Sequence, residues 1–379
     1  MDSARFTSIA AATLFSLAMP FAAAAWEPPG SVMEIGGARL SLSSQEMKAL
    51  SELGGLVRGG GQAARQDRAL EEARRVASTR DARHVLALYE LELGNQRRDD
   101  AMRAKALDVL ITSPMTRSER LPGYLGVRGQ IAYRAGDFGM AGRLWSQLAE
   151  LTPGDPDSLA NLAQVRLAQN DTPGAMELLD RAIAARAALG QQPSEIWYRQ
   201  RLSIAQQGNL VEPGIAAARA LVGSYPTAGN WRIALVVYRQ LGTVDEGLEI
   251  DILRLMRHVG VLQQAAEYQR MAQLLRQSGE PVEAKAVLDE GVKRGLLDAG
   301  TSPTRDIFAE VDRAIAKKPK AALPPSGSAG VRIGSSRLLV GQRAEAEAAF
   351  RSAAADPSAG RYADLAFFWL AALQQPPAS

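Results

Sequence analysis

In 379 residues the sequence contains no cysteine and only two histidines, His84 and His258. Without cysteine, a disulfide framework, a thiol nucleophile and a thiolate metal site are all excluded. The two histidines are far apart in the sequence, so a metal site built from several imidazoles is excluded as well. We expect both histidines at the surface or between helices, and we expect no bound metal.

Aromatic residues are also scarce, at 6% of the chain, and runs of valine and isoleucine of the kind found in strands are nearly absent. Alanine, leucine, arginine, glutamate and glutamine dominate instead, and this composition favours helices. The sequence therefore predicts an all-α protein. The formal net charge is only +3, which does not indicate a nucleic acid partner.

Motifs of known catalytic and cofactor sites are missing too. The sequence has no GxxxxGK[ST], HExxH or GxSxG motif and no glycine fingerprint of a dinucleotide site. Adjacent acidic residues such as Glu71 and Glu72 have the pattern of a solvent-exposed helix face, in which carboxylates pair with neighbouring cations. We expect no enzymatic activity and no cofactor.

A long apolar run lies at the N-terminus. Arg5 is followed by apolar residues from Phe6 to Met19, then by Pro20 and a small-residue series that ends at residue 25. This order is typical of a secretory signal peptide over residues 1–25. An uncleaved anchor is the alternative, but the run is shorter than the ~20 residues that a membrane span needs. We expect cleavage before Trp26, a mature chain without a membrane span, and a periplasmic location.

Beyond this segment the sequence realigns with itself every 34 residues. The first clear copy carries Gly129, Gly136, Ala141 and Trp145, and the intervals recur at Ala163, Asn170, Ala175 and Leu179. Small residues are needed where two helices approach closely, and large residues fill the space between helix pairs. Copies are predicted at 124–153, 158–189, 197–226, from 231 through Gly242, 268–295 and 331–357, with turns at Gly136, Asn170, Gly208, Gly279 and Gly341.

This period and these positions resemble the tetratricopeptide repeat, a helix-turn-helix unit. The resemblance is to exported tetratricopeptide repeat proteins of Gram-negative bacteria, and it implies a right-handed α-solenoid. The expected organisation is a signal peptide (1–25), an extended leader (26–43) that includes an irregular segment or brief hairpin, helical repeats (44–316), a flexible basic and proline-rich linker (317–330), and a last repeat with a capping helix (331–373).

In this family the first helix of each repeat, here called the A helix, lines a concave groove. Carrying that register across places a polar set in the groove: Gln130, Tyr133, Gln164, Tyr198, Arg199, Arg232, Arg239, Gln269, Gln273 and Arg276. Such a lining suits an extended peptide or an acidic segment. A family variant that grips a terminal carboxylate is not expected, because Glu195 stands where that variant has a lysine.

The resemblance implies a non-catalytic protein-binding scaffold in the cell envelope, in envelope assembly or surface polysaccharide export. The alternative is a carbohydrate- or peptidoglycan-binding accessory protein, which would need Tyr133, Trp197 and Trp231 exposed as aromatic platforms. A third alternative is a scaffold that self-associates through its ends, suggested by Phe367 and Trp369. The partner's identity and the oligomeric state are left open.

Overall fold

The computed structural model describes residues 34–35, 38–60, 62–317 and 329–375. Within these ranges the chain forms 18 α-helices, one short 3-10 turn and a two-stranded hairpin, so the predicted all-α class is confirmed. Residues 1–25 and nearly all of the segment 317–330 lie outside the described residues, and the signal peptide and the flexible linker stay predictions. Among the helices that are described, none is both long and apolar enough to cross a bilayer.

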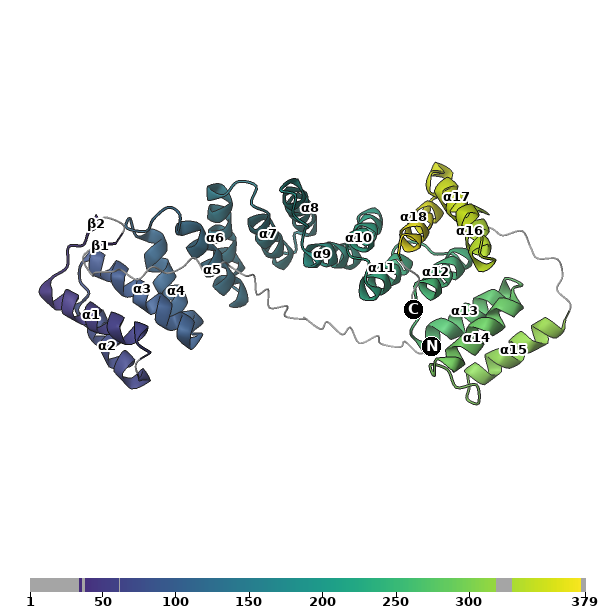
Figure 1. The fold of residues 1–379 in the computed structure, drawn as a ribbon, viewed down its shortest axis with the longest axis horizontal. Helices are drawn as coiled ribbons and strands as arrows, with labels where there is room; N and C mark the ends of the chain where they lie inside the picture. Colours follow the sequence, from purple (N-terminus) through teal and green to yellow (C-terminus); the bar gives the residue numbers. More distant parts are fainter. Residues whose placement is uncertain (1–33, 36–37, 61, 318–328, 376–379) are drawn as a thin grey trace. The chain divides into compact units, whose positions relative to one another are not determined.

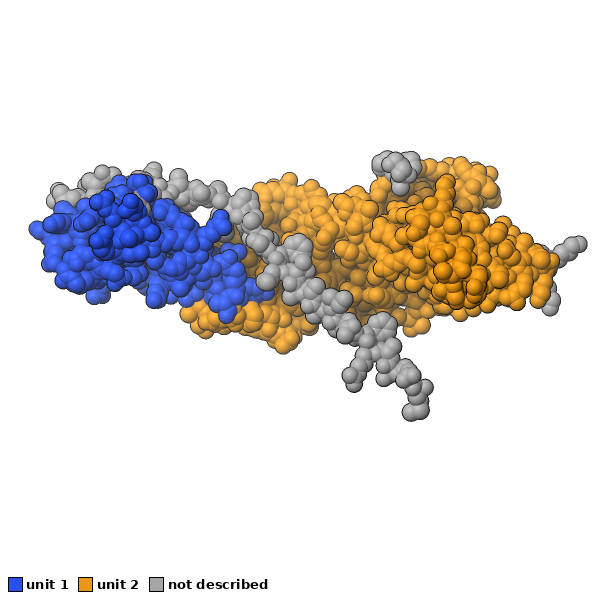
Figure 2. Space-filling model, turned by 90° about the horizontal axis from the view of Figure 1, so that it is seen from below, with its two compact units in different colours: residues 1–135 blue, residues 136–379 orange. Residues whose placement is uncertain are grey.

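The chain divides into two compact units, residues 1–135 and 136–379, coloured separately in Figure 2. The boundary falls at the turn before Gly136, inside the copy predicted at 124–153. The two helices of that copy therefore belong to different units.

Unit 1 begins with an antiparallel hairpin of β1 (Glu34–Ile35) and β2 (Ala38–Arg39), which is one of the two alternatives that the sequence left open for this segment. Five helices follow: α1 (Ser44–Arg58), α2 (Ala63–Val76), α3 (Arg80–Arg97), α4 (Asp100–Thr112) and α5 (Leu121–Arg134). Successive helices pack on one another, and α1 also packs on α3. The apolar faces of α1, α2 and α3 form a core of leucine, valine and alanine around Leu50, Leu53 and Tyr89.

Glu46 joins the start of α1 to the connection between α2 and α3. It forms a capping box with Ser43, and its other carboxylate oxygen accepts hydrogen bonds from the amides of Ser78 and Thr79, at 3.0 and 2.9 Å. The side chain is 1% exposed. Burial alone would raise the pKa of Glu46, but the donors from Thr79, Ser43 and Ser78 lower it from 4.5 to about 2.

Unit 2 is a succession of packed helices coloured from teal to yellow in Figure 1. They are α6 (Phe138–Leu151), α7 (Pro156–Ala168), α8 (Thr172–Ala188), α9 (Glu195–Gln207), α10 (Val211–Ser224), α11 (Ala228–Gln240), α12 (Glu246–His258), α13 (Ala265–Gln277), α14 (Pro281–Lys293), α15 (Thr304–Ala316), α16 (Ala329–Leu339), α17 (Arg343–Ala354), the 3-10 turn η1 (Pro357–Ala359) and α18 (Arg361–Leu373). Helix α16 includes residues 329 and 330, which precede the predicted copy at 331–357.

The turns within the helix pairs need a left-handed residue, and the sequence supplies it at nearly every predicted place. Gly136, Gly279 and Gly341 have φ of 79°, 87° and 78°, and Asn170 takes the same region at 62°. Gly208 lies in the turn as predicted, but it ends α9 in the right-handed region, and the left-handed residue of this turn is Asn209, with φ of 49°. Asparagine tolerates this conformation better than most residues with a side chain.

The predicted small positions lie at close approaches within unit 2. Ala141, Ala175, Ala284 and Ala346 are all 0% exposed. At Gly334 a methyl group would overlap the ring of Phe350 on the partner helix of its pair, so glycine is required there by contact. Stacked helix pairs with these positions buried make the described chain a tetratricopeptide-like α-solenoid. The right-handed sense of the superhelix stays a prediction.

Candidate functional site

Except for Gln164 on α7, the predicted groove residues of unit 2 lie on A helices that are joined by a series of polar contacts, here called the A-helix ladder. Side chains one repeat apart face each other between α9, α11, α13 and α15, because equivalent helices stack side by side. The contacts are Gln206 to Gln240 (2.7 Å), Asn230 to Glu195 (3.0 Å), Arg232 to Glu267 (3.1 Å), Gln269 to Thr304 (3.0 Å) and Arg276 with Glu310 (3.2 Å).

Three arginines of the predicted site are partners in this ladder rather than free cations. Arg199 pairs with Glu195 on its own helix and donates to Asn230 on α11. Arg232 donates both to Glu267 and to the carbonyl of Val261. Arg276 pairs with Glu310. At these positions the positive charges that we expected to bind an acidic segment are therefore paired with groups of this chain.

The Arg232–Glu267 pair is the most buried of these contacts. Glu267 is 4% exposed and also accepts from the amides of Gln263 and Gln264. Burial alone would raise the pKa of Glu267, but the Arg232 guanidinium and these two amides hold it below its ordinary value. The carboxylate is ionised at neutral pH, and the pair holds α13 against α11.

Arg239, Gln164 and Gln273 are predicted groove residues that take no part in the ladder contacts. They are half-buried, and among the described residues their side chains form no hydrogen bond or ion pair. Arg239 follows Arg232 by seven residues and Gln273 follows Gln269 by four, so each shares a helix face with a ladder residue. The other predicted residues, Gln130 and Tyr133, are half-buried on α5 in unit 1, and Tyr198 on α9 is buried.

Sequence reasoning missed the partners of the ladder, which are Glu195, Asn230, Glu267, Thr304 and Glu310. A signal for them was present. Each contact in the ladder joins residues 34 or 35 apart. Adding 34 to Arg276 would have found Glu310, and adding 35 to Arg232 would have found Glu267.

The sequence also did not predict a second contact surface. The C-terminal helices fold back and pack onto the middle of unit 2. Helix α18 packs on α17, as predicted for a capping helix, but also on α10 and α12, and α16 packs on α12 (Figure 1). The ring of Phe368 lies 5.2 Å from Tyr238 and 6.3 Å from Trp231, both on α11. The capping helix therefore covers the third and fourth repeats as well as the last one.

The packing of α18 on α10 and α12 coincides with a change at one repeat position. This position lies nine residues after the left-handed residue of the turn within a helix pair. That position carries a large apolar side chain in most repeats: Leu107, Trp145, Leu179, Leu288 and Phe350. In α10 it is Ala218 and in α12 it is Asp251. Two successive repeats thus lack the large apolar side chain at this position, and α18 packs on α10 and α12, the two helices that lack it.

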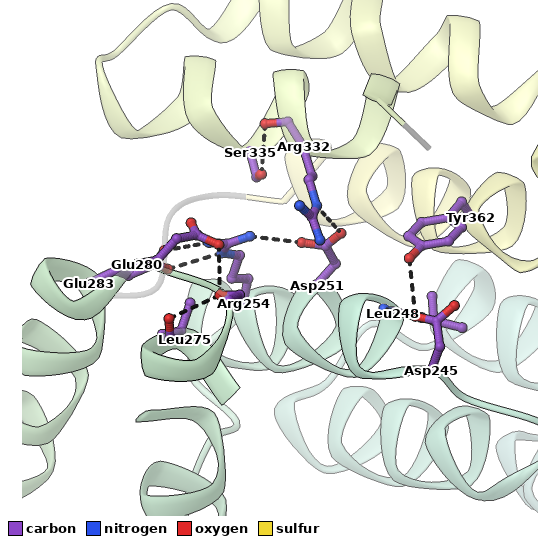
Figure 3. A network of polar contacts seen from close by, with 11 residues as sticks. Asp245, Leu248, Asp251, Arg254, Leu275, Glu280, Glu283, Arg332, Ser335 and Tyr362 are labelled. Atoms are coloured by element: carbon purple, nitrogen blue, oxygen red, sulfur yellow. Dashed lines mark hydrogen bonds and ion pairs between the residues drawn. The ribbon is translucent and has the colours of Figure 1, made fainter. Parts of the chain in front are cut away.

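Asp251 instead anchors a buried charge network, drawn in Figure 3. It is 1% exposed, accepts a hydrogen bond of 3.0 Å from Arg254 and lies 3.6 Å from the Arg332 guanidinium of α16. Arg254 also binds Glu280 and Glu283. Burial raises the pKa of Asp251 above its ordinary value, although both arginines act to lower it. Figure 3 shows Arg332 reaching across from the C-terminal helices to this network.

The aromatic residues named for a carbohydrate site do not form exposed platforms. Trp197 and Trp231 are 2% and 1% exposed, and Tyr133 is half-buried. Trp369 is 3% exposed, stacks on Phe350 and lies 5.0 Å from His258, while Phe367 lies under Arg219. These positions argue against the carbohydrate alternative and place the proposed self-association residues in contacts within the chain.

No cluster of three or more His, Asp or Glu side chains suited to a metal ion occurs in the part of the chain that the structure describes. His84 is 2% exposed on α3, which places it in the interior rather than at the surface. Burial lowers the pKa of His84 below its ordinary value, so it is neutral at pH 7.

The sequence matches no protein-family model and no curated protein. Among solved structures, the chain is similar to BtubC (BKLC) from P. vanneervenii, with 14% identity and a TM-score of 0.28 over 76% of this chain and 98% of that one. It is also similar to yeast Tom70, with 14% identity and a TM-score of 0.30 over 82% of this chain and 69% of that one. With scores this low, the assignment of the fold rests on the helix pairs described above.

Proposed function

We propose that this chain is a non-catalytic protein-interaction scaffold that binds an extended peptide or acidic segment along the A-helix ladder. The observation that supports this most directly is Arg239. It is a half-buried guanidinium without an intramolecular partner among the described residues, on the same helix face as the fully paired Arg232. A carboxylate from a bound peptide would give it a charge-assisted pair.

Gln273 and Gln164 suit the same ligand. A primary amide both donates and accepts, so it can pair with the main chain of an extended segment without requiring a particular side chain. The ladder contacts hold α11 and α13, which carry Arg239 and Gln273, in fixed positions, which reduces the ordering cost of binding. The site therefore combines a rigid frame with a few open polar groups.

The setting that we propose is the periplasm of a Gram-negative bacterium, in envelope assembly or surface polysaccharide export. This part of the proposal rests on the N-terminal sequence and on the resemblance to exported repeat proteins. Fold alone does not assign a process.

Capture of partners from cell extract tests the site. The Arg239→Glu/Gln273→Glu variant should lose the protein that the wild-type chain captures, because two carboxylates would repel an acidic segment. Capture by the wild-type chain should weaken as salt rises. Arg181→Glu is the matched control, since Arg181 is a 59% exposed arginine on α8, a second helix of its pair. Equal capture by the double variant and the control would contradict the proposed site.

A further inference from the structure

The contact between α18 and α10–α12 contains more aromatic residues and arginine than the junction between α7, α8 and α9. Between α7, α8 and α9 the buried core consists mainly of alanine and leucine, for example Ala160, Ala163, Ala175 and Leu179. The α18 contact is instead made by aromatic residues and arginine: Arg219, Trp231, Tyr238, Arg361, Tyr362, Phe367, Phe368 and Trp369. Tyrosine, tryptophan and arginine are the residues enriched where separate protein chains bind each other.

Polar contacts fix the position of α18 at its N-terminal end. The Tyr238 hydroxyl donates to the carbonyl of Arg361, and the Arg361 guanidinium donates to the carbonyls of Thr243 and Tyr238. Asp364 pairs with Arg219 of α10 at 3.1 Å. Together with the missing large residues at Ala218 and Asp251, these groups make α10–α12 an acceptor site that is incomplete without an added helix.

None of these contacts depends on chain continuity. The polar groups that meet across the contact are 117 to 145 residues apart in sequence. Helices α16, α17 and α18 also pack on one another, so they form a small module of their own. The same contacts can therefore form with the module of another molecule at no cost in interactions.

We propose that α10–α12 is a helix-acceptor site for α18 of a second copy of this chain, so that two chains exchange α16–α18 reciprocally. This inference goes beyond the proposed scaffold function and does not depend on it. In the exchanged dimer each Arg219 pairs with Asp364 of the other chain, and each Phe368 lies against Trp231 and Tyr238 of the other chain.

A charge-swap experiment on the full chain tests this directly. Arg219→Asp alone and Asp364→Arg alone each place like charges in contact within one molecule. An exchanged heterodimer of these two variants restores an opposite-charge pair at both sites. The two variants are given different isotope labels and mixed in equal amounts. They should form a heterodimer of twice the monomer mass, and its fraction should be at least about tenfold higher than the dimer fraction of either variant alone. Native mass spectrometry measures this fraction.

The Arg219→Asp/Asp364→Arg double variant is the matched control. It restores the pair within one molecule, whereas an exchanged heterodimer with wild type would join like charges at both sites. If the two single variants form no more heterodimer than this control mixture, the proposal is overturned.

A second measurement covers the case in which a single variant loses its fold. A protease site is placed within 318–328 of the otherwise wild-type chain, and the cut protein is mixed with a tagged copy. After cutting, the α16–α18 fragment should stay bound to folded chains, and part of it should be found bound to the tagged copy. A fragment that dissociates and unfolds, or that never exchanges, overturns the proposal.

Discussion

Replacing Arg254 with alanine is expected to destabilise unit 2 by about 3–5 kcal/mol, because it leaves a buried charge without its partner. Asp251, Glu280 and Glu283 would then lie together without the cation that they share. The guanidinium is 12% exposed, so water cannot replace it. Urea denaturation followed by hydrogen exchange of α12–α14 measures the loss.

Two further variants make this prediction specific. Arg270→Ala removes another arginine–glutamate pair of unit 2, but Arg270 is 43% exposed, and we expect a cost below about 1 kcal/mol. Asp251→Asn in the Arg254→Ala background should recover part of the loss, because it removes the buried negative charge. Equal costs for Arg254→Ala and Arg270→Ala would show that the network does not hold the helices together.

Replacing Glu46 with alanine is expected to cost unit 1 about 3 kcal/mol at neutral pH, because several buried amides lose their acceptor. The folded-state pKa of about 2 lies below the ordinary value of 4.5. The folded chain therefore binds fewer protons than the unfolded chain between these values, and the stabilisation is present above pH 4.5 and lost as the pH falls toward 2.

The measurement is the free energy of unfolding of the wild-type and Glu46→Ala chains between pH 2 and 7, monitored by hydrogen exchange of α1–α3. The two curves should converge toward pH 2. Glu52→Ala removes an exposed carboxylate from the same helix and should change stability little. A gap that stays constant across this pH range would mean that the charge of Glu46 is not the stabilising feature.

The helix pairs could be predicted because each carries its own local signals. A left-handed turn residue, a small residue where two helices approach and a large residue nine positions after the turn all lie within one repeat. Helix formation and the packing of neighbouring helices depend on these short-range features. The capping box of Ser43 and Glu46 was predictable for the same reason.

The return of α18 to α10–α12 could not be predicted from the repeat pattern, because it joins segments more than 100 residues apart. Asp251 stands at a position that is apolar in other repeats, so the fourth repeat is irregular. This irregularity does not indicate which helix completes the fourth repeat. That the groove set binds a ligand stays a prediction. Its residues were placed on A helices by the period, while the pairing of Arg232 and Arg276 depends on which acidic residue stands one repeat further along.

The most direct test of the scaffold function is photo-crosslinking in living cells. A photoreactive amino acid is introduced at Gln273 on the ladder, with Glu177 on α8, which is 73% exposed, as the control position. Light should attach a distinct protein to the chain from position 273 and not from position 177. A protein adduct from position 177 alone, or no protein adduct from position 273, would contradict binding along the A-helix ladder.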